Sequence, residues 1–294
     1  MATKPVVVGA DGSEESLRAV EWGALEAERR RSPLWIVSAP AMPPRMRAHQ
    51  ASPETVTTAL RGISARALGV AITRAEEIAP GLLIDTDLLC GPPAVAVADS
   101  GSGASMLVVG ARGAGGFAAM LLGSVSRYAA THARCPVVVV REETTAVHRE
   151  IAVGVRDPQD GTEALAFGFE EAALRGAELV VVHSWYGFPA TLLASAGAKG
   201  AEQHSADPQQ VTAEAAGSLA ETVTGWRDKY PTVRVRQDVV HGHPARVLAS
   251  YAARADLVVL GRHGGPGTSP GIGSIQHAVL NHAGGPVAVV PSGY

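Results

Sequence analysis

The chain has 294 residues, of which 46% are hydrophobic and 18% charged, and its formal net charge is −3. This length favours two domains with sizeable cores, and the mildly acidic charge argues against a dedicated nucleic-acid-binding protein, which needs clustered Lys and Arg. The N-terminus shows no basic-then-apolar leader, and no window approaches the roughly eighteen apolar residues of a membrane span. We therefore expect a soluble, cytoplasmic protein.

The first half of the chain alternates strand-like and helix-like segments. Ser13 precedes apolar residues at Leu17, Val20 and Ala24, which is the spacing of an amphipathic helix with Ser13 as its N-cap. Strands separated by helices imply right-handed crossovers and a parallel sheet covered on both faces. On these criteria we expect strands over residues 5–10, 34–39, 82–90, 106–109 and 136–140, and helices over 13–31, 53–79, 94–100 and 123–132.

The second half repeats the first. Val-Gly-Val at 153–155 stands where Val-Gly-Ala stands at 8–10. Self-similarity over a whole βα domain indicates a tandem duplication, which predicts domains at residues 1–142 and 149–294 with a charged linker around 141–149. Further matches pair segments 34–38 with 179–183, 86–94 with 237–245, 106–110 with 257–261, and 132–137 with 282–287.

The glycine-rich stretch 105–126 is the strongest candidate for a ligand site. An apolar strand breaks at Gly110 into a loop containing Gly113, and a helix start follows at Gly123 and Ser124. Glycines let backbone N–H groups approach an anion, and a helix N-terminus supplies unpaired donors with a favourable dipole. The stretch therefore predicts a phosphate-binding loop after the fourth strand.

The spacing Gly110, two residues, Gly113, nine residues, Gly123-Ser124, with Asp11 at the end of the first strand and His-Ala-x-x-Pro at 132–136, resembles the ATP-binding branch of the universal stress protein family. The resemblance covers essentially the whole chain, in two copies. It implies an α/β fold of two tandem doubly wound five-stranded parallel sheets, strand order 3-2-1-4-5, which is Rossmann-like and similar to adenine nucleotide alpha hydrolases. The switch point would lie between the first and fourth strands.

The resemblance also implies roles for residues of the first half. Asp11 would hydrogen-bond the ribose, Ala39 would meet adenine through its backbone, and Arg112 would face the nucleotide. ATP is the implied ligand, and Mg²⁺ could accompany it. The triphosphate would be bound by Gly110, Gly113, Gly123, Ser124, Ser126 and the backbone of Val125.

The second half departs from this pattern. Counting without gaps from Gly9 onto Gly154, Arg156 replaces Asp11, with Asp157 one place later. Gln276 replaces Ser126, and the loop is one residue shorter. Loss of the ribose acceptor removes a hydrogen bond worth about 1–3 kcal/mol where partners are left buried. We expect this site to bind more weakly or to bind another ligand, with Arg156 able to reach a phosphate. The corresponding site residues are Gly261, His263 (for Arg112), Gly264, Gly273, Ser274 and Ile275.

Competing motifs fit less well. Gly-Ala-Gly at 113–115 lies outside the context of a dinucleotide fingerprint, and Gly-Thr-Ser-Pro-Gly at 267–271 does not follow its strand directly, as a nucleophile elbow must. His241 and His243 would lie far from His263 in this strand order, so no metal site is expected. His183 is expected to make local hydrogen bonds, and Cys90 and Cys135 are expected to be inert apolar fillers.

The fifth strands of the two copies, 136–140 and 286–290, would leave uncharged apolar sheet edges. We predict that the copies join edge to edge through these strands as a pseudo-dimer, and the whole chain could also form a homodimer. The long connections 40–52 and 186–207 are expected to be binding flaps, the second of them mobile.

The predicted function is ATP binding in a stress-response regulator, with the first half as the stronger site and an unidentified protein partner. No catalytic residue is expected, and any ATP hydrolysis should be slow. Two alternatives stay open: an interaction module that binds no nucleotide, and a slow ATPase or phosphotransferase.

Overall fold

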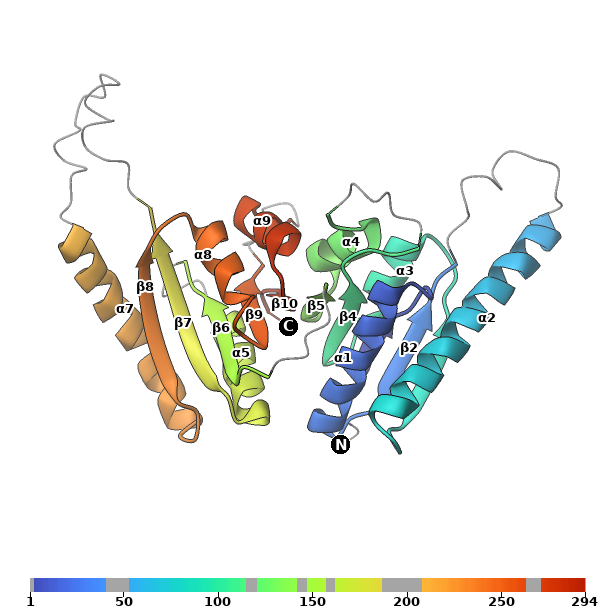
Figure 1. Ribbon diagram of the computed structural model, residues 1–294, viewed down its shortest axis with the longest axis horizontal. Coiled ribbons are helices and arrows are strands. Elements are labelled where there is room, and N and C mark those ends of the chain that lie inside the picture. Colours follow the sequence, from blue (N-terminus) through green and yellow to red (C-terminus); the bar gives the residue numbers. More distant parts are fainter. Residues whose placement is uncertain are drawn as a thin grey trace, which may run out of the picture.

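The computed structural model describes residues 3–40, 53–114, 121–141, 147–156, 162–186, 208–262 and 271–293. Helices and strands alternate through both halves, as predicted (Figure 1). The first half contains β1 (Val6–Gly9), α1 (Glu14–Arg30), β2 (Leu34–Ser38), α2 (Pro53–Ile78), β3 (Ile84–Leu88), α3 (Pro93–Ser100), β4 (Met106–Gly110), α4 (Ser124–His132) and β5 (Val137–Val140). The second contains β6 (Glu150–Gly154), α5 (Thr162–Arg175), β7 (Glu178–Trp185), α7 (Pro208–Lys229), β8 (Val235–His241), α8 (Pro244–Tyr251), β9 (Leu257–Gly261), α9 (Ser274–His282) and β10 (Val287–Val290).

The strands form one sheet in the order β3-β2-β1-β4-β5-β10-β9-β6-β7-β8. Each half has the expected parallel order 3-2-1-4-5, so the two predicted sheets are the halves of one continuous sheet. β5 and β10 pair antiparallel at its centre, with Val139 opposite Val287 and Val137 opposite Val289. The predicted edge-to-edge joining through the fifth strands is confirmed, and it covers both apolar edges.

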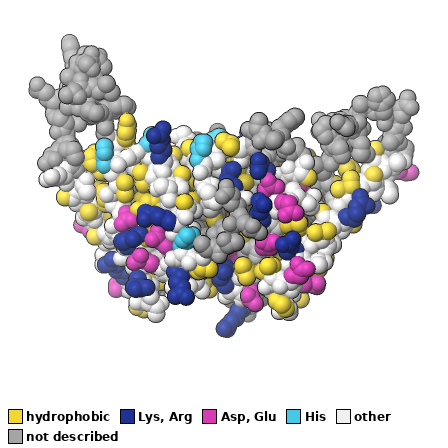
Figure 2. Space-filling view, viewed as in Figure 1, with side chains coloured by type: hydrophobic (Ala, Val, Ile, Leu, Met, Phe, Trp, Pro, Cys, Tyr) yellow, Lys and Arg dark blue, Asp and Glu magenta, His cyan; other side chains and the backbone are white. Residues whose placement is uncertain are grey.

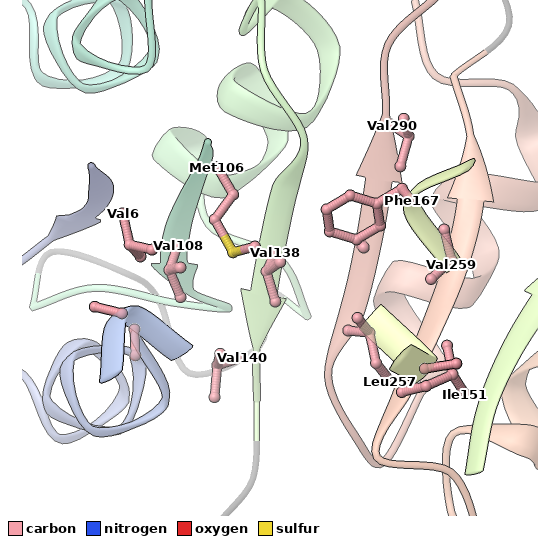
Figure 3. Packing of buried hydrophobic residues seen from close by; sticks show 14 of the residues in the cluster. Val6, Met106, Val108, Val138, Val140, Ile151, Phe167, Leu257, Val259 and Val290 are labelled. Atoms are coloured by element: carbon pink, nitrogen blue, oxygen red, sulfur yellow. The ribbon is translucent and has the colours of Figure 1, made fainter. Parts of the chain in front are cut away.

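Two cores lie on opposite faces of this sheet, because alternate strand residues point to opposite sides. One core packs against α1, α2, α5 and α7, and the other packs against α3, α4, α8 and α9. Figure 3 shows the first of these crossing the junction: Val138 of β5, Phe167 of α5 and Val290 of β10 belong to one cluster. The halves therefore share their hydrophobic cores.

The start of α1 follows the predicted signal. The Ser13 hydroxyl accepts a hydrogen bond from the Ser16 N–H (3.2 Å), and Glu14 and Glu15 occupy the first turn, where acidic side chains favour the helix dipole. This N-cap fixes how α1 leaves the end of β1, which is the edge where the predicted site lies.

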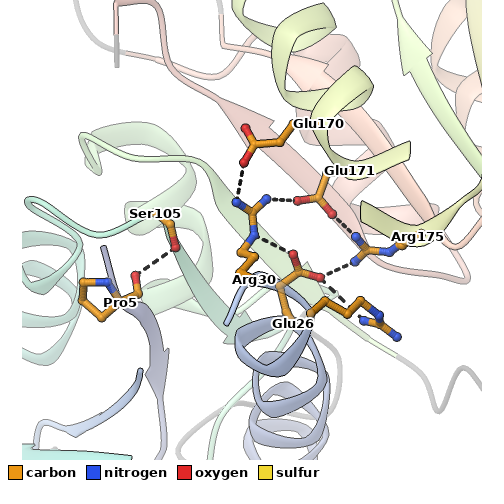
Figure 4. A network of polar contacts seen from close by, with 8 residues as sticks. Pro5, Glu26, Arg30, Ser105, Glu170, Glu171 and Arg175 are labelled. Carbon is orange, nitrogen blue, oxygen red and sulfur yellow. Dashed lines mark hydrogen bonds and ion pairs between the residues drawn. The ribbon is translucent and has the colours of Figure 1, made fainter. Parts of the chain in front are cut away.

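A buried ion-pair network joins α1 to α5 across the two halves (Figure 4). Arg30 donates to Glu26 through Nε and to Glu170 through Nη1, both at 2.6 Å, and it also pairs with Glu171. Arg175 donates to Glu26 at 2.6 Å and pairs with Glu171. Counting from Gly9 onto Gly154, Glu26 corresponds to Glu171 and Arg30 to Arg175, so the duplicated helices present the same charged pair to each other.

The pKa values of Glu26 and Glu171 shift in opposite directions within this network. Burial and the carboxylate of Glu26 raise the pKa of Glu171 to about 7, against the opposing effect of Arg175 and Arg30. Burial also acts to raise the pKa of Glu26, but Arg175 and Arg30 outweigh it, and the pKa lies below its ordinary value. The ionised form of Glu26 is therefore the form that the fold favours.

The stability cost of Glu171→Gln should shrink as the pH rises from about 4.5 through 7. A carboxyl whose folded pKa is raised stabilises the fold below its unfolded pKa, and this contribution is lost as pH rises through the folded pKa. The cost of Glu26→Gln should grow with pH instead, because a lowered folded pKa stabilises the fold above the unfolded value. Urea unfolding from pH 4.5 to 8 measures both, and the same trend in both variants would contradict this assignment.

The prediction that both cysteines are inert apolar fillers is correct for Cys135 and wrong for Cys90. Cys135 is buried, and burial raises the pKa of its thiol to about 12, so the unreactive thiol form dominates at neutral pH. Cys90 is exposed and is no apolar filler, because the chain leaves the sheet edge just after β3.

Basic and acidic side chains are interspersed over the face shown in Figure 2. Among the helices in the described ranges, none has the length and apolar character needed to cross a membrane. The predicted flap residues 41–52 and 187–207 lie outside the described residues.

Candidate functional site

The first-half site lies at the carboxyl ends of β1 and β4, which are neighbours in the sheet. The helices that follow these strands, α1 and α4, belong to opposite faces. When the helices that follow two adjacent parallel strands pack on opposite faces of the sheet, a crevice forms between the carboxyl ends of the strands. This place is the switch point of the sheet. The structure thus places Asp11, just after β1, opposite the loop that follows β4.

Asp11 connects the two strand ends. Its Oδ2 accepts a hydrogen bond from the Ala114 N–H (2.7 Å), and its Oδ1 accepts from the Ser13 N–H (3.0 Å) and hydroxyl (2.6 Å). A Cβ at Gly113 would overlap Asp11 Oδ2, so a larger residue at this position would force the Asp11 side chain to move. The predicted site residues Asp11 and Gly113 are therefore in contact, and the carboxylate keeps lone pairs for a further donor.

Gly110 and Ser126 hold the end of β4 against its neighbours. A Cβ at Gly110 would lie 2.6 Å from the carbonyl oxygen of Glu15, which explains the glycine by packing alone. Ser126 is buried, and its hydroxyl donates to the Gly110 carbonyl (2.6 Å). That hydroxyl hydrogen-bonds to the backbone at the end of β4, a role that the glycine spacing gave no signal for.

The remaining first-half residues line up along the same edge. Gly123 is the N-cap of α4 and provides no side-chain hydrogen bond, so the N-terminal N–H groups at exposed Ser124 and half-buried Val125 have no side-chain cap. Arg112 pairs with Glu15 (2.9 Å), and Ala39 follows β2, half-buried. The Arg112–Glu15 pair could not be anticipated from spacing.

The second half encloses a pocket of about 330 Å³ at the equivalent edge. Four predicted residues line it: Gly261, Gly273, Ser274 and Ile275. Arg156 also lines it, at the position of Asp11. His263 and Gly264 lie outside the described residues.

Several lining residues were not predicted. Val182 and Ser184 come from β7, and Pro244 and Leu248 come from α8. The repeat contained the signal for Ser184, which aligns with Ala39. The wall from α8 had no local signal, because only the fold brings Leu248 to the end of β6, where it would meet a Cβ at Gly154 at 2.8 Å.

The histidines behave largely as structural groups. His183 Nδ1 lies 3.1 Å from the Val155 carbonyl oxygen, which confirms the expected local hydrogen bond. His241 stacks with Trp185 at a ring-centroid distance of 4.4 Å. β7 and β6 separate β8 from β9. Over the described ranges, no group of three His, Cys, Asp or Glu side chains could hold a metal ion.

The fold and both sites define a class: a tandem α/β protein with two Rossmann-like halves, in each of which the strand beside the switch point ends in glycine. The profile of the universal stress protein family matches residues 2–141 and 148–291. The chain belongs to the universal stress protein family.

Relatives of similar length support this membership. The chain is 34% identical to universal stress protein Rv2005c of Mycobacterium tuberculosis, with 97% of this chain and 96% of the relative covered. It is 32% identical to a universal stress protein of Mycolicibacterium smegmatis, with 97% and 96% covered. A crystal structure of a universal stress protein from Archaeoglobus fulgidus superposes with a TM-score of 0.71 at 17% identity, covering 99% of this chain and 97% of that one, and it shows the shared fold.

Proposed function

We propose that the chain binds adenine nucleotides at the carboxyl edge of each half and acts as a nucleotide-dependent regulator rather than as an enzyme. The observation that carries the proposal is the same arrangement in both halves: a strand end, a glycine-terminated neighbouring strand and a helix N-terminus without a side-chain cap. Such N–H groups attract phosphate. In the second half this arrangement encloses the pocket described above, within the usual volume range of small-molecule sites.

We propose ATP as the ligand of the first half, which we assign as the stronger site. Asp11 stands where a ribose hydroxyl would donate to it, and its contact with Ala114 keeps the β4–α4 loop beside the strand end. In this role Asp11 is committed to the sugar, so ATP hydrolysis should be slow. Each proposed domain, 1–142 and 149–294, then forms one nucleotide-binding unit.

Regulation follows if the nucleotide binds one arrangement of the protein better than another, because a ligand shifts an equilibrium only by its differential affinity. The test begins with acid extraction of the purified full chain and identification of any released adenine nucleotide, followed by calorimetric titration with ATP, with and without Mg²⁺. A nucleotide-free chain that binds no ATP would favour the interaction module. Labelled product formed from labelled ATP would favour a phosphotransferase.

Asp11→Ala should weaken ATP binding to the first half about tenfold to hundredfold, since it removes a charged hydrogen-bond acceptor. Two-site titration calorimetry measures the loss. Glu14→Ala is the matched control, because it removes an exposed carboxylate in the first turn of α1. Gly273→Ala should have a smaller effect, since its Cβ would approach a side-chain atom, Gln276 Oε1, at 2.7 Å, and the second half is proposed as the weaker ATP site. Equal losses from Asp11→Ala and Gly273→Ala would overturn the proposed order of the two sites.

A further inference from the structure

The two halves carry opposite charges at one equivalent position. The Ala10 N–H donates to the Val37 carbonyl, and the Val155 N–H donates to the Val182 carbonyl, so the strand ends superimpose in register. The next residue is Asp11 in the first half and Arg156 in the second. The exchange changes the formal charge at this point by two units.

The pocket around Arg156 offers two positions for anions. Among the described residues that line it, Arg156 is the charged side chain. The second position is the N-terminus of α9, where Gly273 is the N-cap and no side chain caps the helix. Its N–H groups carry the positive end of the helix dipole. Two other polar side chains of the lining donate to backbone carbonyls: Gln276 donates to Gly261 (2.8 Å), and Ser184 donates to Gly242 (2.6 Å).

The rest of the wall suits an uncharged planar or apolar body. Val182, Leu248, Leu260 and Ile275 line the pocket. The pocket therefore combines apolar walls with two separate cationic positions. A ligand complementary to this pocket has an uncharged body and two anionic groups. One anionic group would lie near Arg156 at the end of β6, and the other near the N-terminus of α9.

We propose that the second-half pocket selects a nucleotide that carries a phosphate on its ribose, at the 2′ or 3′ position, in addition to its 5′-phosphate. This inference rests on the proposed function, which puts the ribose beside Asp11 at the end of β1, and on the repeat, which makes the end of β6 the equivalent position. A carboxylate accepts from ribose hydroxyls and repels a ribose phosphate, whereas a guanidinium pairs with the phosphate through two parallel hydrogen bonds. The same exchange separates NAD sites from NADP sites in dinucleotide-binding folds.

The test compares AMP with adenosine 3′,5′-bisphosphate and adenosine 2′,5′-bisphosphate by titration calorimetry. The full chain carries Asp11→Ala, so that the second half dominates the signal. We expect at least one bisphosphate to bind about tenfold to hundredfold more tightly than AMP. Arg156→Asp should remove this preference. Arg234→Asp makes the same charge change on an exposed residue before β8, at the opposite edge of the sheet, and should retain the preference.

Three results would overturn the inference. Equal affinity for AMP and both bisphosphates, or a preference that survives Arg156→Asp, would refute it while leaving the proposed function standing, since AMP would still bind. Failure of ATP, AMP and both bisphosphates to bind the unsubstituted chain would refute the proposed function as well. Arg156→Gln removes the charge without reversing it, and it replaces Arg156→Asp if thermal unfolding shows that the latter misfolds.

Discussion

Replacing Glu26 with alanine should lower the free energy of unfolding by about 3–5 kcal/mol. Glu26 is fully buried and receives hydrogen bonds from Arg30 and Arg175, whose side chains are 10% and 7% exposed. Removing the carboxylate leaves these guanidinium groups underpaired in the interface between α1 and α5, where water cannot replace the lost partner. Urea unfolding of the full chain at neutral pH measures the loss.

Glu170→Ala is the matched control for this prediction. Glu170 contacts the same Arg30 at 2.6 Å, but its side chain is 47% exposed. Solvent-exposed ion pairs contribute about 0–1 kcal/mol, so this variant should remain close to the unsubstituted chain. Similar losses from Glu26→Ala and Glu170→Ala would show that burial does not set the contribution of the network.

Gly110→Ala should destabilise the chain by about 3 kcal/mol, through overpacking. The added Cβ would lie 2.6 Å from the Glu15 carbonyl oxygen and 2.7 Å from its carbon. Both are backbone atoms of the first turn of α1, so α1 or β4 must move. We also expect weaker ATP binding, because the same shift separates Asp11 from the β4–α4 loop.

Gly261→Ala is the equivalent change in the second half and should alter stability by less than about 1 kcal/mol. There the added Cβ would meet the Ala164 Cβ at 3.7 Å, an ordinary contact. Thermal unfolding of the two variants makes the comparison directly. Equal destabilisation by both substitutions would contradict the packing explanation for Gly110.

Much of the architecture was predictable because it follows from local periodicity and from the repeat. The N-cap at Ser13 and the alternation of strands and helices are properties of short segments. The pairing of β5 with β10 followed from two uncharged apolar strands that each needed a partner. Family membership followed from the glycine spacing in two copies. The roles assigned to individual site residues stay predictions.

The features that only the tertiary structure decided depend on side chains that are distant in the chain. Arg30 and Glu171 are 141 residues apart in the chain. No sequence pattern in α1 or α5 predicts that these two charged side chains pair and become buried together. The wall that Leu248 adds to the second-half pocket likewise arises when α8 packs over the end of β6. The sequence by itself determined the repeated strand–helix order, the glycine loops and the exchange of Asp11 for Arg156, since these are properties of one segment or of two aligned ones. The tertiary structure decided which charges are buried and which residues enclose a ligand, because burial and enclosure depend on how packed elements exclude water.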